Sequence, residues 1–284
     1  MPVPRTTDLR RCRAIVAGRG PIVGLIVAMA ALPSAASTQA PEVFESTQSA
    51  NLPTAAMIRG GLWMFEISHR FLPPISDGVD AFWGLDGPVN NRLGLAYAPS
   101  DRVMIGVLRS NFDGNVEFNL KGQLLSGSVG EWRYQIGAMG GIGFNFNALE
   151  TADVENNESQ FYGQAIANVR WRDVALGVVP TGFRNPRIED SDPVNTFAVG
   201  LHGQYYAMRS LSVLAEWNMS VESVDYPYDA VSAGLEIRTR GHAFKLVLSN
   251  QVRMNPTQFL VGTPSDYGAD QLRIGFNITR VLSF

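Results

Sequence analysis

Long stretches in which apolar and polar residues alternate one by one constrain this chain more than any other feature. In residues 211–221, every second residue from Leu211 to Val221 is apolar, and most of those between are polar. Residues 231–238 follow the same rule, beginning with Val231. A period of two is that of a β-strand with one apolar and one polar face. The pattern predicts an all-β fold.

The alternation recurs in twelve segments separated by turn residues. These are residues 61–71, 90–98, 102–110, 116–125, 131–144, 160–171, 173–179, 195–207, 211–221, 230–240, 242–250 and 271–284. Long and short connections alternate along the chain. The one exception is residues 111–114, a short connection at a place where the alternation predicts a long one. Short turns at one end and long loops at the other are typical of outer-membrane barrels. We therefore expect a transmembrane antiparallel up-and-down β-barrel of about 12 strands over residues 61–284.

The N-terminal region has the pattern of a secretory signal peptide. A basic region with Arg10, Arg11, Arg13 and Arg19 precedes an apolar run from Pro21 to Leu32, and the small residues 34–36 follow it. The run is too short for a membrane-spanning helix. We expect cleavage after Ala36, which removes the only cysteine, Cys12, and with it any disulfide or thiolate metal site. The 23 basic and 26 acidic residues then become 18 and 25, a net charge of −7, which argues against nucleic acid as a partner.

Residues 37–60 contain Pro41 and Pro53 and show no regular period. We interpret them as an extended N-terminal lead-in on the periplasmic side of the barrel. Their sequence leaves open whether they enter the lumen.

Aromatic residues gather on the apolar face at the strand ends next to the short turns. They are Trp63, Tyr97, Trp132, Tyr134, Trp171, Tyr205 and Phe244. Trp and Tyr suit the headgroup boundary of a bilayer, because they combine an apolar ring with a polar N–H or O–H group. We predict that these seven residues form a membrane girdle in contact with outer-membrane lipid.

Two features add a resemblance to known proteins. The chain ends on Phe284, at the apolar parity of LRIGFNITRVLSF, which resembles the C-terminal signal that the barrel-assembly machinery recognises. The blocks GLWMFEISHRF, DAFWGLDGPVNNRLGLAYAPSDRVMIGVLRS and VEFNLKGQLL resemble the start of an uncharacterised family of bacterial outer-membrane β-barrels, a domain of unknown function. The matching positions are His69 to Phe71, Trp83 to Asp86 with Trp83 in place of Phe, and Arg109 with Ser110. The resemblance implies a barrel fold and an outer-membrane location but no activity.

If the apolar parity faces lipid, the opposite parity lines the lumen. Its predicted charged residues are Arg70, Arg92, Lys121, Arg133, Arg170, Arg238, Lys245 and Arg273, with Glu66, Glu117, Glu216 and Glu236. The excess of cations predicts a narrow porin-like channel that favours small anionic solutes. Acidic residues gather instead in the long loops, at positions 150, 153, 155 and 158 and at 189, 190 and 192. Those of the first loop are candidates for bridging lipopolysaccharide through divalent cations. A non-conducting structural barrel, whose charges pair with one another, is the first alternative.

Other functions have weaker support in the sequence. A lipid-modifying enzyme would need a nucleophile and a base, and Ser68 with His69 is the one pair to consider, although the two have opposite parity. His202 and His242 are interpreted as structural, so we predict no catalytic residues. The loop at 148–159 lacks the spacing of an EF-hand, and we predict no metal site and no cofactor. A soluble periplasmic β-sandwich would show the same alternation and is the remaining alternative.

Overall fold

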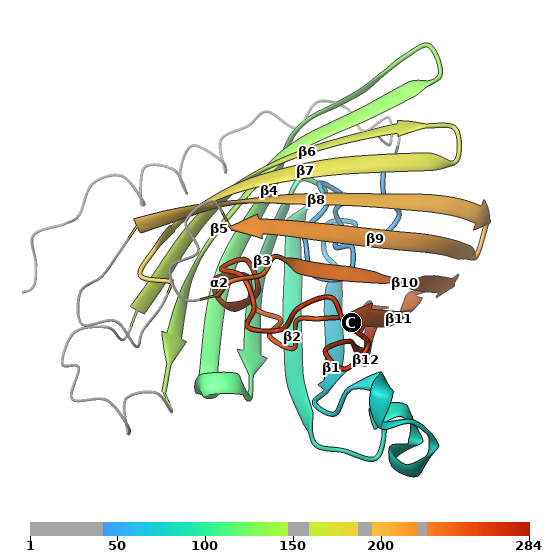
Figure 1. The fold of residues 1–284 in the computed structure, drawn as a ribbon. Coiled ribbons are helices and arrows are strands. Elements are labelled where there is room, and N and C mark those ends of the chain that lie inside the picture. Colours follow the sequence, from blue (N-terminus) through green and yellow to red (C-terminus); the bar gives the residue numbers. More distant parts are fainter. Residues whose placement is uncertain (1–41, 147–158, 187–194, 221–225) are drawn as a thin grey trace, which may run out of the picture. The chain divides into compact units, whose positions relative to one another are not determined.

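The computed structural model describes residues 42–146, 159–186, 195–220 and 226–284. In this part of the chain twelve antiparallel strands form one closed barrel, in which each strand pairs with its sequence neighbours and β1 closes against β12 (Figure 1). The strands are β1 (Trp63–Phe71), β2 (Val89–Ser100), β3 (Val103–Ser110), β4 (Asn115–Val129), β5 (Trp132–Asn145), β6 (Ser159–Trp171), β7 (Val174–Arg184), β8 (Asn195–Met208), β9 (Leu211–Ser220), β10 (Ala230–Thr239), β11 (His242–Ser249) and β12 (Arg273–Leu282). The predicted twelve-stranded antiparallel barrel is confirmed.

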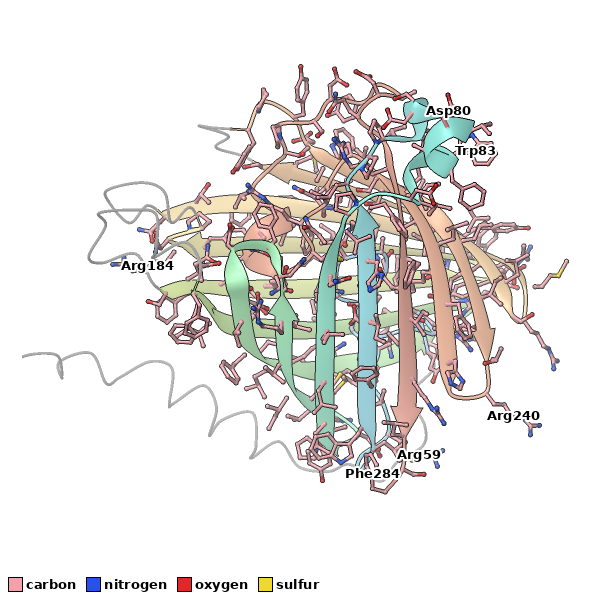
Figure 2. The ribbon with its side chains drawn as sticks, turned by 90° about the horizontal axis from the view of Figure 1, so that it is seen from below. Arg59, Asp80, Trp83, Arg184, Arg240 and Phe284 are labelled. Carbon is pink, nitrogen blue, oxygen red and sulfur yellow. The ribbon has the colours of Figure 1, made fainter. Side chains whose placement is uncertain are left out.

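The two ends of the barrel differ, as the connection lengths predicted. One end carries tight turns, such as Gly130 to Glu131 and Arg240 to Gly241. The other carries the β1–β2 connection with η1 (Ile75–Asp77) and η2 (Val79–Gly84), the short η3 (Phe112–Gly114), and the β11–β12 connection with α2 (Pro256–Phe259). Figure 2 shows Asp80 and Trp83 beyond one end of the strands and Arg59, Arg240 and Phe284 at the other. We call these the long-loop end and the short-turn end.

The wall has its apolar side outside and its polar side inside. On β9, Val213 and Trp217 point outward and are about half exposed, whereas Glu216 and Asn218 point inward and are buried. Outward apolar side chains with a polar interior reverse the arrangement of a water-soluble protein, and this is the arrangement of a barrel whose outer surface contacts lipid. No helix among the described residues is long and apolar enough to cross a membrane.

Two strands extend four or five residues beyond their predicted C-terminal ends. β4 continues to Val129, with a bulge at Leu124 where its register against β5 shifts. β7 continues through Pro180 to Arg184. Pro180 has no N–H group to donate, and the ladder between β6 and β7 is interrupted there, but the pairing of β7 with β8 remains continuous and carries the strand on.

Residues 42–60 belong to the predicted N-terminal lead-in, for which the sequence left open whether it enters the lumen. They are blue in Figure 1, and they run inside the barrel rather than outside it, where Val43, Phe44, Ala50 and Leu52 are fully buried. The physical reason is the polar wall: inward charged side chains need hydrogen-bond partners, and the backbone of this segment supplies them. We call residues 42–60 the N-terminal segment.

Candidate functional site

The lumen is the candidate site, because the charged side chains of the wall converge there on the N-terminal segment. Lys121 of β4 donates hydrogen bonds to the backbone oxygens of Thr47 at 3.0 Å, Thr54 at 3.2 Å and Ala56 at 2.8 Å. Lys245 of β11 donates to the oxygens of Gln48 and Ser49. Both ammonium groups are buried, so these carbonyl groups replace the water that would otherwise solvate them.

Asn51 of the segment is held between a cation and a carboxylate. Arg70 of β1 donates to Asn51 Oδ1 at 3.0 Å, and Glu216 of β9 accepts from the backbone N–H groups of Asn51 and Leu52, both at 2.8 Å. Asn277 of β12 completes the contact by accepting from Arg70 at 2.7 Å and donating to the oxygen of Ala50. Three strands far apart in the sequence therefore fix one short stretch of the segment.

Arg92 and Glu66 form an ion pair inside the wall. Arg92 of β2 donates to Glu66 Oε1, which also accepts from Ser68 Oγ. Arg92 reaches the segment as well, through Gln48 Oε1 at 3.3 Å, and the long-loop end through the oxygen of Met254. Both charged side chains are almost fully buried, so each depends on the other for its electrostatic stabilisation.

The segment enters the lumen near the short-turn end, beside Glu45. Its carboxylate contacts Arg170 of β6 at 3.2 Å and Arg238 of β10, and its backbone N–H donates to the hydroxyl of Tyr206 on β8 at 3.1 Å. The neighbouring Phe44 stacks on the ring of His202, with centroids 4.7 Å apart.

The β11–β12 connection fills the lumen from the long-loop end. Residues 254–261, which include α2, are buried, and Asn255 donates to Asn115 of β4. Phe259 and Leu260 share one apolar cluster with Leu52 and Ala55 of the N-terminal segment and with inward side chains of β6, β7 and β8. The wall members are Tyr162, Ile166, Val179, Phe183 and Ala198. The two fillers therefore meet inside the barrel.

Inward glycines make room for the segment. A Cβ atom on Gly200 of β8 would lie 2.4 Å from Leu52 Cδ2. One on Gly137 of β5 would lie 2.8 Å from the backbone oxygen of Gly122 in the wall and in ordinary contact, at 3.4 Å, with the Cβ of Ala55. A cavity of about 70 Å³ remains between the segment and strands β1 to β5, lined by Gln48, Asn51, Glu66, Arg92 and Lys121 among others. It has room for a few water molecules.

The remaining predicted lumen residues lie as follows. Glu117 of β4 is buried and accepts from Tyr162 at 2.7 Å, and Glu236 of β10 is buried and pairs with Lys245 at 3.2 Å. Arg273 lies half-buried at the long-loop end, where it donates to the oxygen of Leu72 at 2.7 Å. Arg133 is exposed at the tip of the β4–β5 hairpin, in the same parity as the buried Gln135.

The predicted girdle residues lie on the outer face near the short-turn end. Trp132, Tyr134, Trp171, Tyr205 and Phe244 are each about two fifths to one half exposed, and Trp63 and Tyr97 are partly exposed. Trp132 and Trp171 stack with centroids 6.1 Å apart across the β5–β6 pair. Phe284 lies beyond the end of β12 and is almost fully exposed. The predicted signal peptide, the acidic residues of 150–158 and those of 189–192 lie outside the described residues.

Ser68 and His69 do not come together. Ser68 is buried on the inner face and donates to Glu66, whereas the His69 ring packs on Phe276 on the outer face, with centroids 4.5 Å apart. Among the described residues, no three His, Cys, Asp or Glu side chains are grouped as metal ligands.

The sequence predicted the charged wall residues but not their partners on the segment, chiefly Glu45, Asn51 and a run of backbone carbonyls. Asn168 and Gln123 were also missed, although they bind the N–H and the oxygen of Ala55. Their inward parity was the one signal that could have found them.

A closed, antiparallel barrel with an apolar outer face and a polar, filled lumen defines an integral β-barrel of the bacterial outer membrane. Within that class the chain belongs to the DUF5777 family, described as a membrane-bound beta barrel domain, which matches residues 44–282. The predicted family resemblance and the outer-membrane location are thereby confirmed.

Solved structures with a similar fold share little sequence with this chain. The outer membrane channel from Pseudomonas putida F1 is 13% identical, with a TM-score of 0.44, over 80% of this chain and 98% of that one. The NanC porin is 9% identical, with a TM-score of 0.43, over 78% and 99%. Outer membrane phospholipase A from Escherichia coli is 10% identical, with a TM-score of 0.40, over 78% and 90%. No curated protein sequence matches the chain.

Proposed function

We propose that the protein is an outer-membrane channel for small anionic solutes, closed in the described state by its own N-terminal segment. The observation that carries the proposal is the way this segment is held: it is no part of the wall, and polar contacts from many strands bind it. Lys121, Lys245 and Glu216 all bind its backbone. Water or a polar solute could replace each of these contacts, so the filling of the lumen is reversible in principle.

The size of the barrel supports a channel. Eight strands enclose an interior that wall side chains alone can fill, whereas sixteen leave an open aqueous pore. Twelve strands lie between these limits, and here the extra space is occupied by residues 42–60 and 254–261. Both fillers are separate from the strands of the wall, so the space that they occupy would be open to solvent if they moved.

The charge of the wall supports selectivity for anions. Without the N-terminal segment, the inward side chains would include Arg70, Arg92, Lys121, Arg170, Arg238 and Lys245, against Glu66, Glu117, Glu216 and Glu236. Arg70 and Lys121 make no ion pair within the described residues and bind neutral oxygens instead. Their charges would face the solute when the segment moves, and this lowers the barrier for anions.

The test is reconstitution in a planar bilayer with a KCl gradient, comparing the mature wild type with Gly200→Val. Valine at this position collides with Leu52 and should displace the segment. Gly163→Val is the matched control, since a Cβ there has open space around it. We expect rare openings for the wild type and the control, frequent openings for Gly200→Val, and a reversal potential that shows anion selectivity.

Cation selectivity would contradict the anion-channel proposal. If Gly200→Val retains heat-modifiable migration but shows no conductance steps, the barrel does not conduct. That result would favour the alternative of a structural barrel. Lipid hydrolysis by the wild type in micelles that is lost on Ser68→Ala would instead favour the enzyme alternative.

A further inference from the structure

Glu45 occupies a site that the barrel wall builds around a carboxylate. Its Oε1 contacts Arg170 Nη1 at 3.2 Å and its Oε2 contacts Arg238 Nη1, so each carboxylate oxygen has a guanidinium of its own. The two arginines come from β6 and β10, and Tyr206 from β8 lies between those strands in the barrel. Guanidinium groups match carboxylate oxygens in geometry and stay charged at all physiological pH values.

Contacts within the wall hold Arg170 independently of Glu45. The Arg170 guanidinium lies over the Tyr206 ring, 4.0 Å from its centroid, and Arg170 Nε donates to the oxygen of Arg172 at 2.8 Å. Both contacts persist if the N-terminal segment leaves, so Arg170 stays oriented toward the lumen. A group held in its binding geometry before the ligand arrives loses little conformational entropy on binding.

Charge balance indicates what replaces Glu45. The Arg170, Arg238 and Glu45 side chains are all mostly buried, at 12%, 28% and 19% exposed. Glu42 of the N-terminal segment also interacts electrostatically with both arginines. Displacing the segment therefore removes two carboxylates and leaves the two cations in a poorly solvated place, which is unfavourable. An anion with two oxygens at carboxylate spacing restores the balance.

We propose that Arg170, Arg238 and Tyr206 form a binding site for carboxylate-bearing solutes, which Glu45 occupies when the lumen is closed. This inference rests on the proposed channel and names its substrate class. Solute and Glu45 compete for one site, so a carboxylate solute shifts the population toward the state in which the segment is displaced. The site lies where the segment enters, near the short-turn end.

The test measures binding without relying on current. Calorimetry in detergent follows succinate binding to the mature wild type, to Glu45→Gln, and to Glu45→Gln combined with Arg170→Gln and Arg238→Gln. Glu131→Gln is the matched control, because it removes an exposed carboxylate that pairs with Arg172 at the same end of the barrel. Heat-modifiable migration on gels verifies that each variant folds.

We expect Glu45→Gln to bind succinate about 10-fold more tightly than the wild type, because a tethered competitor acts at an effective concentration in the millimolar range. Glu131→Gln should bind succinate with the affinity of the wild type. The triple variant should not show the increased affinity of Glu45→Gln. Equal succinate affinity in Glu45→Gln and the wild type overturns the proposal, as does a gain that the triple variant retains.

Two further outcomes separate this inference from the channel proposal. If Glu45→Gln raises the affinity for inorganic phosphate as much as the affinity for succinate, the site binds oxyanions in general. That result would overturn the carboxylate assignment. Tight succinate binding that depends on both arginines, in a barrel that never conducts, would uphold the site and overturn the channel.

Discussion

Leu52 of the N-terminal segment lies directly over Gly200 of β8, so close that a Cβ atom added to Gly200 would be 2.4 Å from Leu52 Cδ2. Leu52 is fully buried in the apolar cluster that also contains Phe259 from the other filler. The wall is therefore complementary in shape to this segment, because Gly200 has no side chain and Leu52 occupies the space that one would fill. A larger residue at position 200 should act on the segment before it acts on the barrel.

The first prediction uses this contact to measure the position of the segment. Ser49 is fully buried in the segment, so Ser49→Cys should resist a maleimide reagent in a chain that lacks Cys12. Adding Gly200→Val should make the new thiol reactive, with a rate about 5-fold faster or more, since an overpacked contact typically costs about 1–3 kcal/mol. Labelling followed by gel shift measures the rate.

Gly163→Val serves as the control for the labelling experiment too, because it adds the same side chain to a strand at a position with open space. Equal labelling rates in the two glycine variants would mean that the collision at Leu52 is absorbed without moving the segment.

The second prediction concerns Lys121, which donates to three backbone oxygens of the segment. Lys121→Met keeps most of the side-chain volume but removes every donor. Hydrogen bonds to charged groups contribute about 1.5–3 kcal/mol each, so amide exchange in residues 47–56 should speed up by roughly 10-fold or more. Hydrogen-exchange mass spectrometry on the peptides of the segment tests this.

Arg172→Met removes an exposed cation and its ion pair with Glu131. It should leave exchange in the segment at the wild-type rate, because exposed pairs contribute about 0–1 kcal/mol. Faster exchange throughout the barrel in Lys121→Met would show that Lys121 holds the wall rather than the segment.

The strands could be predicted from the sequence because their period is local. The alternation of apolar and polar residues in a strand has a period of two, so a short window of sequence is enough to detect it. β7 was predicted too short because Pro180 and Gly182 interrupt the pattern, and only the pairing with β8 carries the strand past them. Strand pairing depends on two segments of the chain, so it cannot be predicted from the sequence of β7 alone.

The place of the N-terminal segment could not be predicted, because its contacts are long-range and use the backbone. Lys121 lies more than 60 residues from the carbonyls that it binds, and Lys245 more than 190. A carbonyl group is the same in every residue, so nothing in the sequence of the segment marks it as the partner. The sequence pattern therefore predicts cations on the wall without revealing that backbone groups of the same chain are their hydrogen-bond partners.

The third prediction compares two ion pairs of different burial. Glu66→Gln leaves Arg92 buried without its carboxylate, and losing one partner of a buried pair typically costs about 3–5 kcal/mol. Glu131→Gln breaks the exposed pair with Arg172 and should cost about 0–1 kcal/mol. The midpoints of urea unfolding in detergent, followed by tryptophan fluorescence, measure the difference. Similar midpoints for both variants would show that the oxygens of Gln48 and Met254 are sufficient to stabilise Arg92.

The last prediction tests which medium covers the outer face. Leu246 lies in the middle of β11 and is 56% exposed, and Trp132 lies at the start of β5 near the short turns and is 52% exposed. In water, arginine at either position would be tolerated equally. In a bilayer, Leu246→Arg places its charge near the midplane and should cost about 2–4 kcal/mol, whereas Trp132→Arg reaches the headgroups and should cost about 0–1 kcal/mol for its charge. Trp132→Gln corrects for the lost aromatic ring and Leu246→Gln for the lost leucine. Unfolding of the four variants in phospholipid vesicles gives the comparison, and an equal charge penalty at both positions would contradict a hydrocarbon layer around the middle of this barrel.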